Sequence, residues 1–190
     1  LNFKEIEKNI VRCPDAKTAE KMVNAIMKAR KNGDSLGGIV EVIARGVPAG
    51  LGEPVFDRLD AELAKAVMSI PAVKGMEIGA GFQTASMKGS ECNDVFVMKN
   101  KKMTTKTNNA GGILGGISNG MDIVIKLVVK PTSSINKAQD TITQKGGNSK
   151  IRVEGRHDPC VAPRAVPIAE AMVALTLIDH LLRNKNSQLT

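Results

Sequence analysis

The fold is decided by the stretch Ala110-Gly-Gly-Ile-Leu-Gly-Gly-Ile-Ser-Asn-Gly-Met-Asp-Ile-Val-Ile-Lys-Leu-Val-Val129. Ile123, Ile125, Leu127 and Val129 alternate with other residues, and this period of two predicts a strand over residues 121–129 with one buried face. Paired glycines accept the backbone angles of tight turns, so the segment before the strand predicts a hairpin. The same bare backbone would also let a flat or phosphorylated ligand approach, and the sequence leaves both interpretations open.

Helices and strands alternate on either side of this stretch. Asp15 is a good helix N-cap and Gly33 a good stop, which predicts a helix between them. Residues 79–109 predict a long excursion or a pair of short strands, and residues 133–152 an irregular chain. The glycine turns favour an α+β fold, with antiparallel sheets layered with helices in one domain over residues 1–190, rather than a doubly wound sheet. The expected helices are 16–32, 55–70 and 167–183, and the other expected strands are 38–44 and 73–78.

The composition is that of a folded protein. The chain has 190 residues, of which 42% are hydrophobic, and this is too apolar for disorder. The three cysteines form no CxxC pair, so neither a disulfide framework nor a zinc site is favoured, and no metal is expected. No uninterrupted apolar run reaches the roughly 18 residues of a membrane span. We therefore expect a soluble, cytoplasmic protein without a membrane partner.

The charge points to an anionic partner. There are 27 Lys and Arg and 19 Asp and Glu, so the net charge is 27 − 19 = +8. Nucleic-acid binding would pair basic clusters with aromatic platforms, but the chain has no Trp or Tyr, and its four Phe lie apart from the basic stretch Lys99–Lys106. Small anionic ligands are therefore favoured, and no nucleic acid is expected.

The segment Lys130-Pro-Thr-Ser-Ser134 follows the alternating strand. Pro131 ends the strand ladder. The ammonium group of Lys130, the hydroxyls of Thr132, Ser133 and Ser134, and the backbone N–H groups can hold a phosphate or a carboxylate. An ordinary polar turn is the alternative.

A second reactive segment is Glu154-Gly-Arg-His-Asp-Pro-Cys160. Arg156 can bind a phosphate with two hydrogen bonds, and Asp158 can accept or relay a proton. A Cys160 thiolate paired with His157 is not favoured, because no third group orients it. The other histidine, His180, lies in an apolar helix, where a hydrogen-bonded core histidine is expected.

Taken together these motifs resemble chorismate synthase, in order and over nearly the whole chain, from about Cys13 to Arg183. The fold implied is half of that family's β-α-α-β sandwich. The segments that carry the resemblance are Gly46–Asp60, Met68–Gly75, the glycine segment through Gly120, Lys130–Ser134, Gly155–Cys160 and Ala165–Met172.

The resemblance implies an elimination of phosphate from 5-enolpyruvylshikimate-3-phosphate in the anti-1,4 sense, with reduced FMN present, to give chorismate for the shikimate pathway. Asp158 matches the family's acidic residue near the flavin and is the expected catalytic residue. The family often has Asn where this chain has Pro71, which puts a side-chain contact there in doubt. The FMN contacts implied are Pro71, Ala72, Gly115, Lys130, Pro131, Thr132, Ser133, Ser134 and Arg156.

Family members are roughly twice as long as this chain, by resemblance, and the missing part precedes Leu1. It contains both proposed catalytic histidines and substrate-binding arginines, so the chain resembles the C-terminal half and is predicted to be inactive alone. Without the other half, the apolar helix Ile168–Leu182 should leave a large hydrophobic surface exposed or cause self-association. The family forms tetramers. Whether the parent enzyme reduces its own flavin with NADPH or uses an outside reductant stays open.

Two alternatives differ in class from half an enzyme. A flavin- or phosphate-binding module would keep the cofactor site without chemistry. A structural or nucleic-acid-associated basic protein would bind nucleic acid in a salt-sensitive way, but it gives no reason for the grouping of Arg156 and Asp158.

Overall fold

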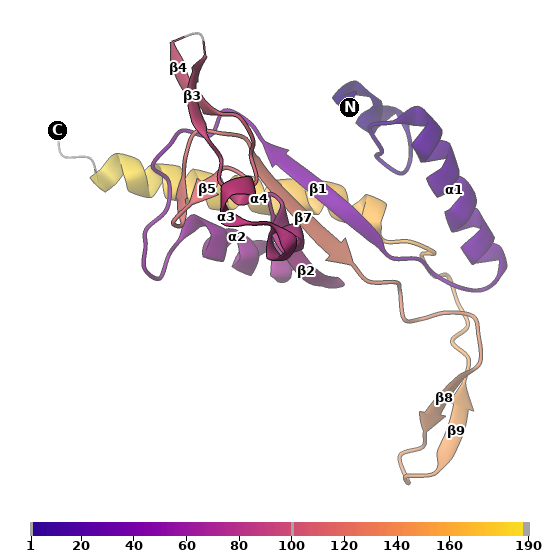
Figure 1. Cartoon of the computed structure of the whole chain (residues 1–190). Coiled ribbons are helices and arrows are strands. Elements are labelled where there is room, and N and C mark those ends of the chain that lie inside the picture. The colour runs from indigo at the N-terminus through magenta and orange to yellow at the C-terminus, as the bar shows by residue number, and fades with distance from the viewer. Residues whose placement is uncertain (1, 100, 188–190) are drawn as a thin grey trace. The chain divides into compact units, whose positions relative to one another are not determined.

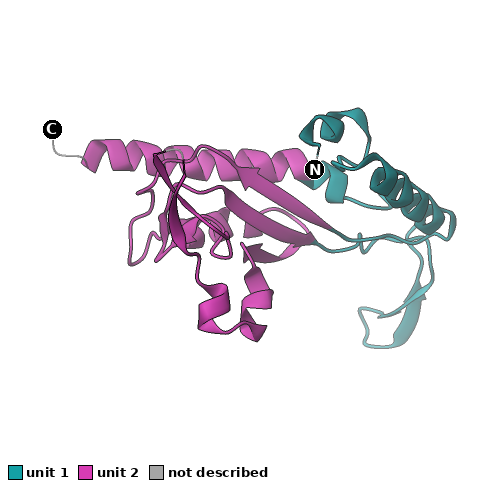
Figure 2. Ribbon diagram, turned by 45° about the horizontal axis from the view of Figure 1, so that its top comes forward, with its two compact units in different colours: residues 1–38, 129–165 teal, residues 39–128, 166–190 magenta. Residues whose placement is uncertain are grey.

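A computed structural model describes residues 2–99 and 101–187. By its internal contacts the chain divides into two compact units, which Figure 2 colours separately. Unit 1 consists of residues 1–38 and 129–165, and unit 2 of residues 39–128 and 166–190. The expectation of one domain over residues 1–190 stays a prediction.

The α+β class is confirmed, because helices accompany several small sheets. β7 lies between β1 and β2 in a three-stranded sheet (Figure 1). The remaining strands form antiparallel hairpins, β3 with β4, β5 with β6 and β8 with β9. The elements are η1 Phe3–Lys8, α1 Ala16–Lys31, β1 Gly38–Ala44, α2 Leu59–Met68, β2 Val73–Ile78, η2 Gly81–Ser86, α3 Gly89–Cys92, β3 Phe96–Lys99, β4 Lys102–Thr105, β5 Ile113–Leu114, β6 Ile117–Ser118, β7 Ile123–Val129, β8 Gln139–Ile142, β9 Asn148–Ile151 and α4 Ala162–Ser187.

The alternating strand provides the centre of the main core. The four alternate side chains of β7 that were expected to face one way, Ile123 to Val129, are at most 1% exposed. Leu59, Leu63 and Val67 form one stripe of α2 and are 0% exposed, and this helix contacts β2. Each fully buried side chain of this size contributes roughly 1.5–3 kcal/mol, so this stripe and β7 hold unit 2 together.

Unit 1 has a smaller core and a well-capped helix. The Asp15 carboxylate accepts a hydrogen bond from the backbone N–H of Thr18 at 2.7 Å, which satisfies one of the free donors at the start of α1. Gly33 follows α1 with a φ of +66°, as its role as a stop predicts. Val11, Cys13 and Ala19 are buried together, with Val23 and Ile26 packed against them.

The helix expected over residues 55–70 begins later, at Leu59. The preceding residues form a narrow antiparallel bridge, in which the N–H of Glu53 donates to Asp57 O at 2.8 Å and the N–H of Asp57 donates to Glu53 O at 3.0 Å. Backbone groups committed to this bridge cannot also form a helical turn. The apolar spacing alone did not reveal this competition.

Two polar regions contain regular structure that the sequence pattern did not predict. The pair of short strands expected within residues 79–109 is confirmed by β3 and β4, but the helical turns η2 and α3 were missed. The irregular chain expected over 133–152 is wrong, because β8 and β9 form a hairpin there. Most side chains of this hairpin are exposed, so no buried face imposes an alternating apolar pattern.

α4 is longer than the expected helix of residues 167–183, and Pro163–Pro167 lies within it rather than leading up to it. The N–H of Ala165 already donates to Val161 O at 3.1 Å. Proline favours a first turn, which placed the expected start at Pro167. The structure tolerates Pro167 inside the helix, although the ring cannot donate to the carbonyl of Pro163.

One side of α4 packs and the other is uncovered, as expected for an apolar helix in a half-length chain. Ala169 and Val173 are at most 2% exposed, whereas Leu175 is 63% and Leu182 is 54% exposed. By length and composition alone α4 is also apolar enough to cross a membrane, although polar residues interrupt the run. The core helix of a soluble protein can have the same length and composition.

Candidate functional site

The expected site residues divide between the two units. Lys130–Ser134, Arg156 and Asp158 belong to unit 1, and Pro71, Ala72 and Gly115 belong to unit 2. The convergence of all these residues around one ligand stays a prediction.

Within unit 1 the structure brings the two predicted segments to one cavity of about 190 Å³. Ser134 comes from the first segment, and Arg156 and Asp158 from the second. The other lining residues are Arg30, Gly33, Asp34, Ser35, Ile135, Asn136, Gly155, His157 and Pro159. A polar cavity therefore joins parts of the chain that lie far apart in sequence.

The residues that follow α1 connect the two segments. The hydroxyl of Ser35 donates to the backbone carbonyl of Thr132 at 2.6 Å, and the N–H of Leu36 donates to Pro159 O at 2.8 Å. Gly37 allows this close approach, since a Cβ there would lie 2.6 Å from Val129 O. The sequence analysis assigned no site role to Ser35. Ser35 lies between Gly33, which follows α1, and Gly38, which begins β1, and only this position could have suggested such a role.

Asp158 is held by a neighbour that the sequence analysis missed. A guanidinium nitrogen of Arg164 donates to the Asp158 carboxylate at 2.6 Å, and the Asp158 side chain is 36% exposed. Arg164 lies in the first turn of α4, six residues after Asp158. A charge-assisted hydrogen bond of this kind fixes the direction of a carboxylate and leaves its second oxygen available.

The loop after β7 has polar groups that are free to bind a ligand. Among the residues that the structure describes, the buried hydroxyl oxygen of Thr132 has no hydrogen-bond partner. Lys130 and Ser133 are exposed, and Lys130 forms no ion pair with the described residues. These groups fit the expected contacts with an anion.

The cavity carries a second carboxylate, that of Asp34. Lys137 Nζ contacts this carboxylate at 2.5 Å, and the N–H of Ser35 also donates to it. These two hydrogen bonds, that of Lys137 first, hold the pKa of Asp34 below its ordinary value. Asp34 is therefore ionised and paired at neutral pH.

The other reactive side chains of this segment are engaged elsewhere. Nε2 of His157 lies 3.2 Å from the backbone carbonyl of Val153. The thiol of Cys160 points to the carbonyl of Gly37, with 4.0 Å between Sγ and the oxygen. Neither arrangement orients a thiolate nucleophile. Among the described residues, no three His, Cys, Asp or Glu side chains form a group that could hold a metal ion.

In unit 2, Gly115 lies in the turn of a hairpin, which confirms the hairpin interpretation of the glycine segment. Gly115 and Gly116, which lie between β5 and β6, have φ angles of +59° and +84°. A two-residue hairpin turn of type I′ requires a positive φ at both of its central residues. Gly116 O accepts from the N–H of Leu59 at 2.8 Å, which fixes the turn against α2. A Cβ at Gly115 would meet nothing within 4 Å, so the turn also leaves room for a ligand.

Pro71 and Ala72 form the turn between α2 and β2. Ala72 has a φ of +70°, in the left-handed region that residues with a Cβ adopt only at a cost of roughly 1–2 kcal/mol. Pro71 has no side-chain donor, so its contact with a flavin would be limited to its carbonyl and its ring.

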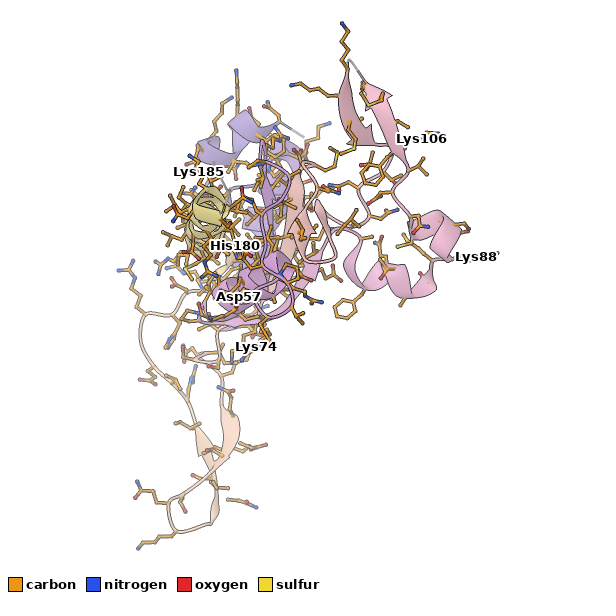
Figure 3. The ribbon with its side chains drawn as sticks, turned by 90° about the vertical axis from the view of Figure 1, so that its left-hand side faces the viewer. Asp57, Lys74, Lys88, Lys106, His180 and Lys185 are labelled. Carbon is orange, nitrogen blue, oxygen red and sulfur yellow. The ribbon has the colours of Figure 1, made fainter. Side chains whose placement is uncertain are left out.

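His180 is buried as expected, but its ring makes no hydrogen bond to the residues that the structure describes. It is 1% exposed, and neither ring nitrogen has a partner among the residues described. One turn further on, Arg183 donates to the Asp57 carboxylate at 3.0 Å. Figure 3 shows His180 and Asp57 in the body of unit 2, away from Lys88 and Lys106.

Fold and site define an α+β protein with a polar cavity suited to a phosphate or carboxylate ligand. The sequence model of one family, chorismate synthase, matches residues 2–182. The chain therefore belongs to the chorismate synthase family.

Relatives and a solved structure agree with this membership. The chain is 61% identical to the chorismate synthase of Methanosarcina barkeri and 57% identical to that of Crocosphaera subtropica, over 97% and 96% of its length. These matches cover 52% and 51% of the relatives. A crystal structure of chorismate synthase matches 95% of the chain and 47% of its own, with a TM-score of 0.78 and 34% identity. The chain thus spans about half the length of the curated relatives it matches.

Proposed function

We propose that this chain is the flavin-binding part of a chorismate synthase, a carbon–oxygen lyase. The reaction is the anti-1,4-elimination of phosphate from 5-enolpyruvylshikimate-3-phosphate to give chorismate, with reduced FMN required. The single observation that carries the proposal is the family match over residues 2–182. The shared cavity of Ser134, Arg156 and Asp158 supports it.

The residues present fit FMN. Thr132 offers a buried hydroxyl without a partner in the described chain, and the turn at Gly115 leaves space beside its backbone. Lys130, Ser134 and Arg156 supply the charge and donors for a phosphate. When bound, reduced FMN would supply an electron-rich ring that promotes loss of phosphate without net oxidation or reduction. Pro71, Ala72, Pro131 and Ser133 complete the proposed contacts.

Asp158 is the proposed catalytic residue, as a group that accepts and passes on a proton. Arg164 acts as a positioning residue, because its guanidinium holds one carboxylate oxygen of Asp158 at 2.6 Å. A carboxyl group with one oxygen held in place and the other available is suited to proton transfer at a defined place.

We further propose that the chain alone is inactive. The leaving phosphate needs a general acid, and neither histidine of this chain is suited to that role. His157 is directed to the carbonyl of Val153, and His180 is 1% exposed. The half of the relatives that this chain does not match would supply the acid and most of the anion-binding arginines, without which little transition-state stabilisation remains.

Two measurements test this function. In a steady-state assay of the chain with substrate and reduced FMN, we expect no turnover above background, and normal turnover would refute the proposed inactivity. In a fluorescence titration with FMN, we expect quenching. No quenching at high micromolar protein would remove both the flavin site and the alternative of a non-catalytic FMN- or phosphate-binding module.

For the whole protein, we propose a homotetramer located in the cytoplasm. The exposed apolar side chains of α4 support self-association, since a monomer rarely leaves so much contiguous apolar surface in water. The substrate is the only further partner proposed.

A further inference from the structure

We propose that Ser118 is a positioning residue, which holds the turn of Gly115 and Gly116 where a flavin can reach its backbone. Ser118 is the last residue of β6, two residues after Gly116, and it is 3% exposed. It has no part in the contacts proposed above and acts on a ligand only through the turn. The inference rests on the proposed function only for the identity of the ligand, FMN.

The hairpin that carries this turn is too short to fix its own position. Its strands have two residues each, Ile113–Leu114 and Ile117–Ser118. A hairpin of two strands is marginally stable at best in water. Leu114 is 43% exposed and Ile117 is 38% exposed, so their side chains provide little packing. Contacts outside the hairpin therefore determine where the turn lies.

Ser118 makes such contacts with both its side chain and its backbone. The hydroxyl donates to Pro48 O at 2.6 Å and accepts from the N–H of Leu51 at 2.9 Å. The N–H of Ser118 donates to Leu51 O at 2.9 Å, and its carbonyl accepts from the N–H of Gly50 at 2.8 Å. Almost any residue could make the two backbone bonds, but the other two need a group that both donates and accepts. The hydroxyl therefore fastens the hairpin to residues 48–51 in a way that an apolar side chain could not.

The segment that Ser118 binds continues directly against the turn. A Cβ at Gly52 would lie 2.1 Å from Gly116 O, so no space separates residue 52 from the turn. The same carbonyl oxygen accepts from the N–H of Leu59 at 2.8 Å. A shift of residues 48–52 would therefore displace the turn. Gly115 itself stays open to a ligand, since a Cβ there would meet nothing within 4 Å.

Burial makes the hydroxyl of Ser118 hard to replace. Leu51 is 1% exposed, so in Ser118→Ala its N–H would lose its side-chain partner away from water. A buried donor without a partner is strongly unfavourable. That donor can find water only if residues 48–51 move outward, and this movement carries the turn away from its place.

The first experiment observes the turn by amide hydrogen exchange of the chain and of its Ser118→Ala variant. Leu59 is the first residue of α2, so its N–H has no partner within the helix and its protection depends on Gly116 O. Val67 lies in the last turn of the same helix, where N–H groups bond within the helix, and it serves as the internal reference. We expect exchange at Leu59 to become about tenfold faster relative to Val67. An unchanged ratio overturns the inference.

The second experiment follows FMN binding by fluorescence titration, and the bound flavin by its visible circular-dichroism band at saturating FMN. We expect Ser118→Ala to weaken binding about tenfold and to change the band, because the ring then meets a displaced turn. Ile125→Val is the matched control, since it shortens a fully buried side chain of β7 and destabilises unit 2 in its sheet rather than at the turn. It should weaken binding less than about twofold and leave the band unchanged.

Equal effects of the two variants on binding and on the band overturn the inference and leave the proposed function standing. If the wild-type chain does not quench FMN fluorescence, the proposed flavin site fails, and the ratio of exchange rates at Leu59 and Val67 alone decides the role of Ser118. If Ser118→Ala does not fold, as its far-ultraviolet circular dichroism would show, Ser118→Cys replaces it in both experiments. A thiol is only a weak donor and acceptor, so the same changes are expected to a smaller extent.

Discussion

The hydroxyl of Ser35 donates a 2.6 Å hydrogen bond to the backbone carbonyl of Thr132, across 97 positions of sequence. This contact fastens the loop after β7 to the residues that follow α1. Two positions along from Thr132, Ser134 lines the cavity that also contains Arg156 and Asp158. The proposed phosphate site therefore depends on a bond that neither segment makes by itself.

Ser35→Ala should loosen this loop. Loss of one partly buried hydrogen bond lowers the free energy of unfolding by about 1 kcal/mol, and FMN binding should weaken with it. Chemical denaturation measures the change in the free energy of unfolding, and fluorescence titration with FMN measures the change in binding. Ser69→Ala is the matched control, because that hydroxyl bonds only locally, to Ala66 O. Equal effects of the two substitutions on ligand binding would contradict the role of Ser35.

Asp94 should make unit 2 sensitive to acid. Burial acts to raise the pKa of its carboxyl, but hydrogen bonds from the Thr107 hydroxyl and from the N–H groups of Ala110 and Asn109 outweigh it and lower that pKa below its ordinary value. A depressed folded-state pKa contributes stability above the unfolded-state value of about 3.9. This stability is lost as the pH falls through the folded-state pKa.

Asp94→Asn should therefore lower the free energy of unfolding at neutral pH by about 2 kcal/mol. It should also flatten the dependence of stability on pH below about 4. Urea denaturation of both proteins over a range of pH measures this difference. An unchanged pH dependence in the variant would show that the Asp94 carboxylate does not stabilise the loop before β5.

His180→Leu should not destabilise the protein. The ring is 1% exposed and neither nitrogen has a partner among the described residues, so the native state already bears the cost of an unpaired polar group. An apolar side chain of similar size removes that cost. As a control, Val173→Thr adds an unpaired hydroxyl to the same buried side of α4 and should cost about 1–3 kcal/mol. A loss above about 2 kcal/mol for His180→Leu would reveal a partner for the ring.

Leu175→Glu should reduce self-association of the chain. Leu175 is 63% exposed on the uncovered side of α4, near Ile178 at 48% and Leu182 at 54%. Burying such side chains between copies would drive association. Light scattering behind size-exclusion chromatography gives the mass of each variant. Met98→Glu changes an exposed apolar residue of the β3–β4 hairpin instead and should leave the mass unchanged. A monomeric wild type would contradict the expectation.

Much of the local structure and the family were determined by the sequence itself. Asp15 and Gly33 mark the limits of α1 because caps act within one turn of the chain. The alternation from Ile123 to Val129 marks β7 because a strand with one buried face must alternate. The motifs around Lys130 and Arg156 identified the family because the order of such motifs along the chain is characteristic of that family.

Only the tertiary structure decided which side chains meet. The link from Ser35 to Thr132, the pairing of Arg164 with Asp158 and the cavity position of Arg30 depend on contacts between distant segments, which leave no periodic pattern in a sequence. The bridge between Glu53 and Asp57 shortened α2 for a similar reason, since backbone groups already paired cannot also form a helix. His180 looked like an ordinary core histidine, and only packing showed that its ring is buried without a partner in the described chain.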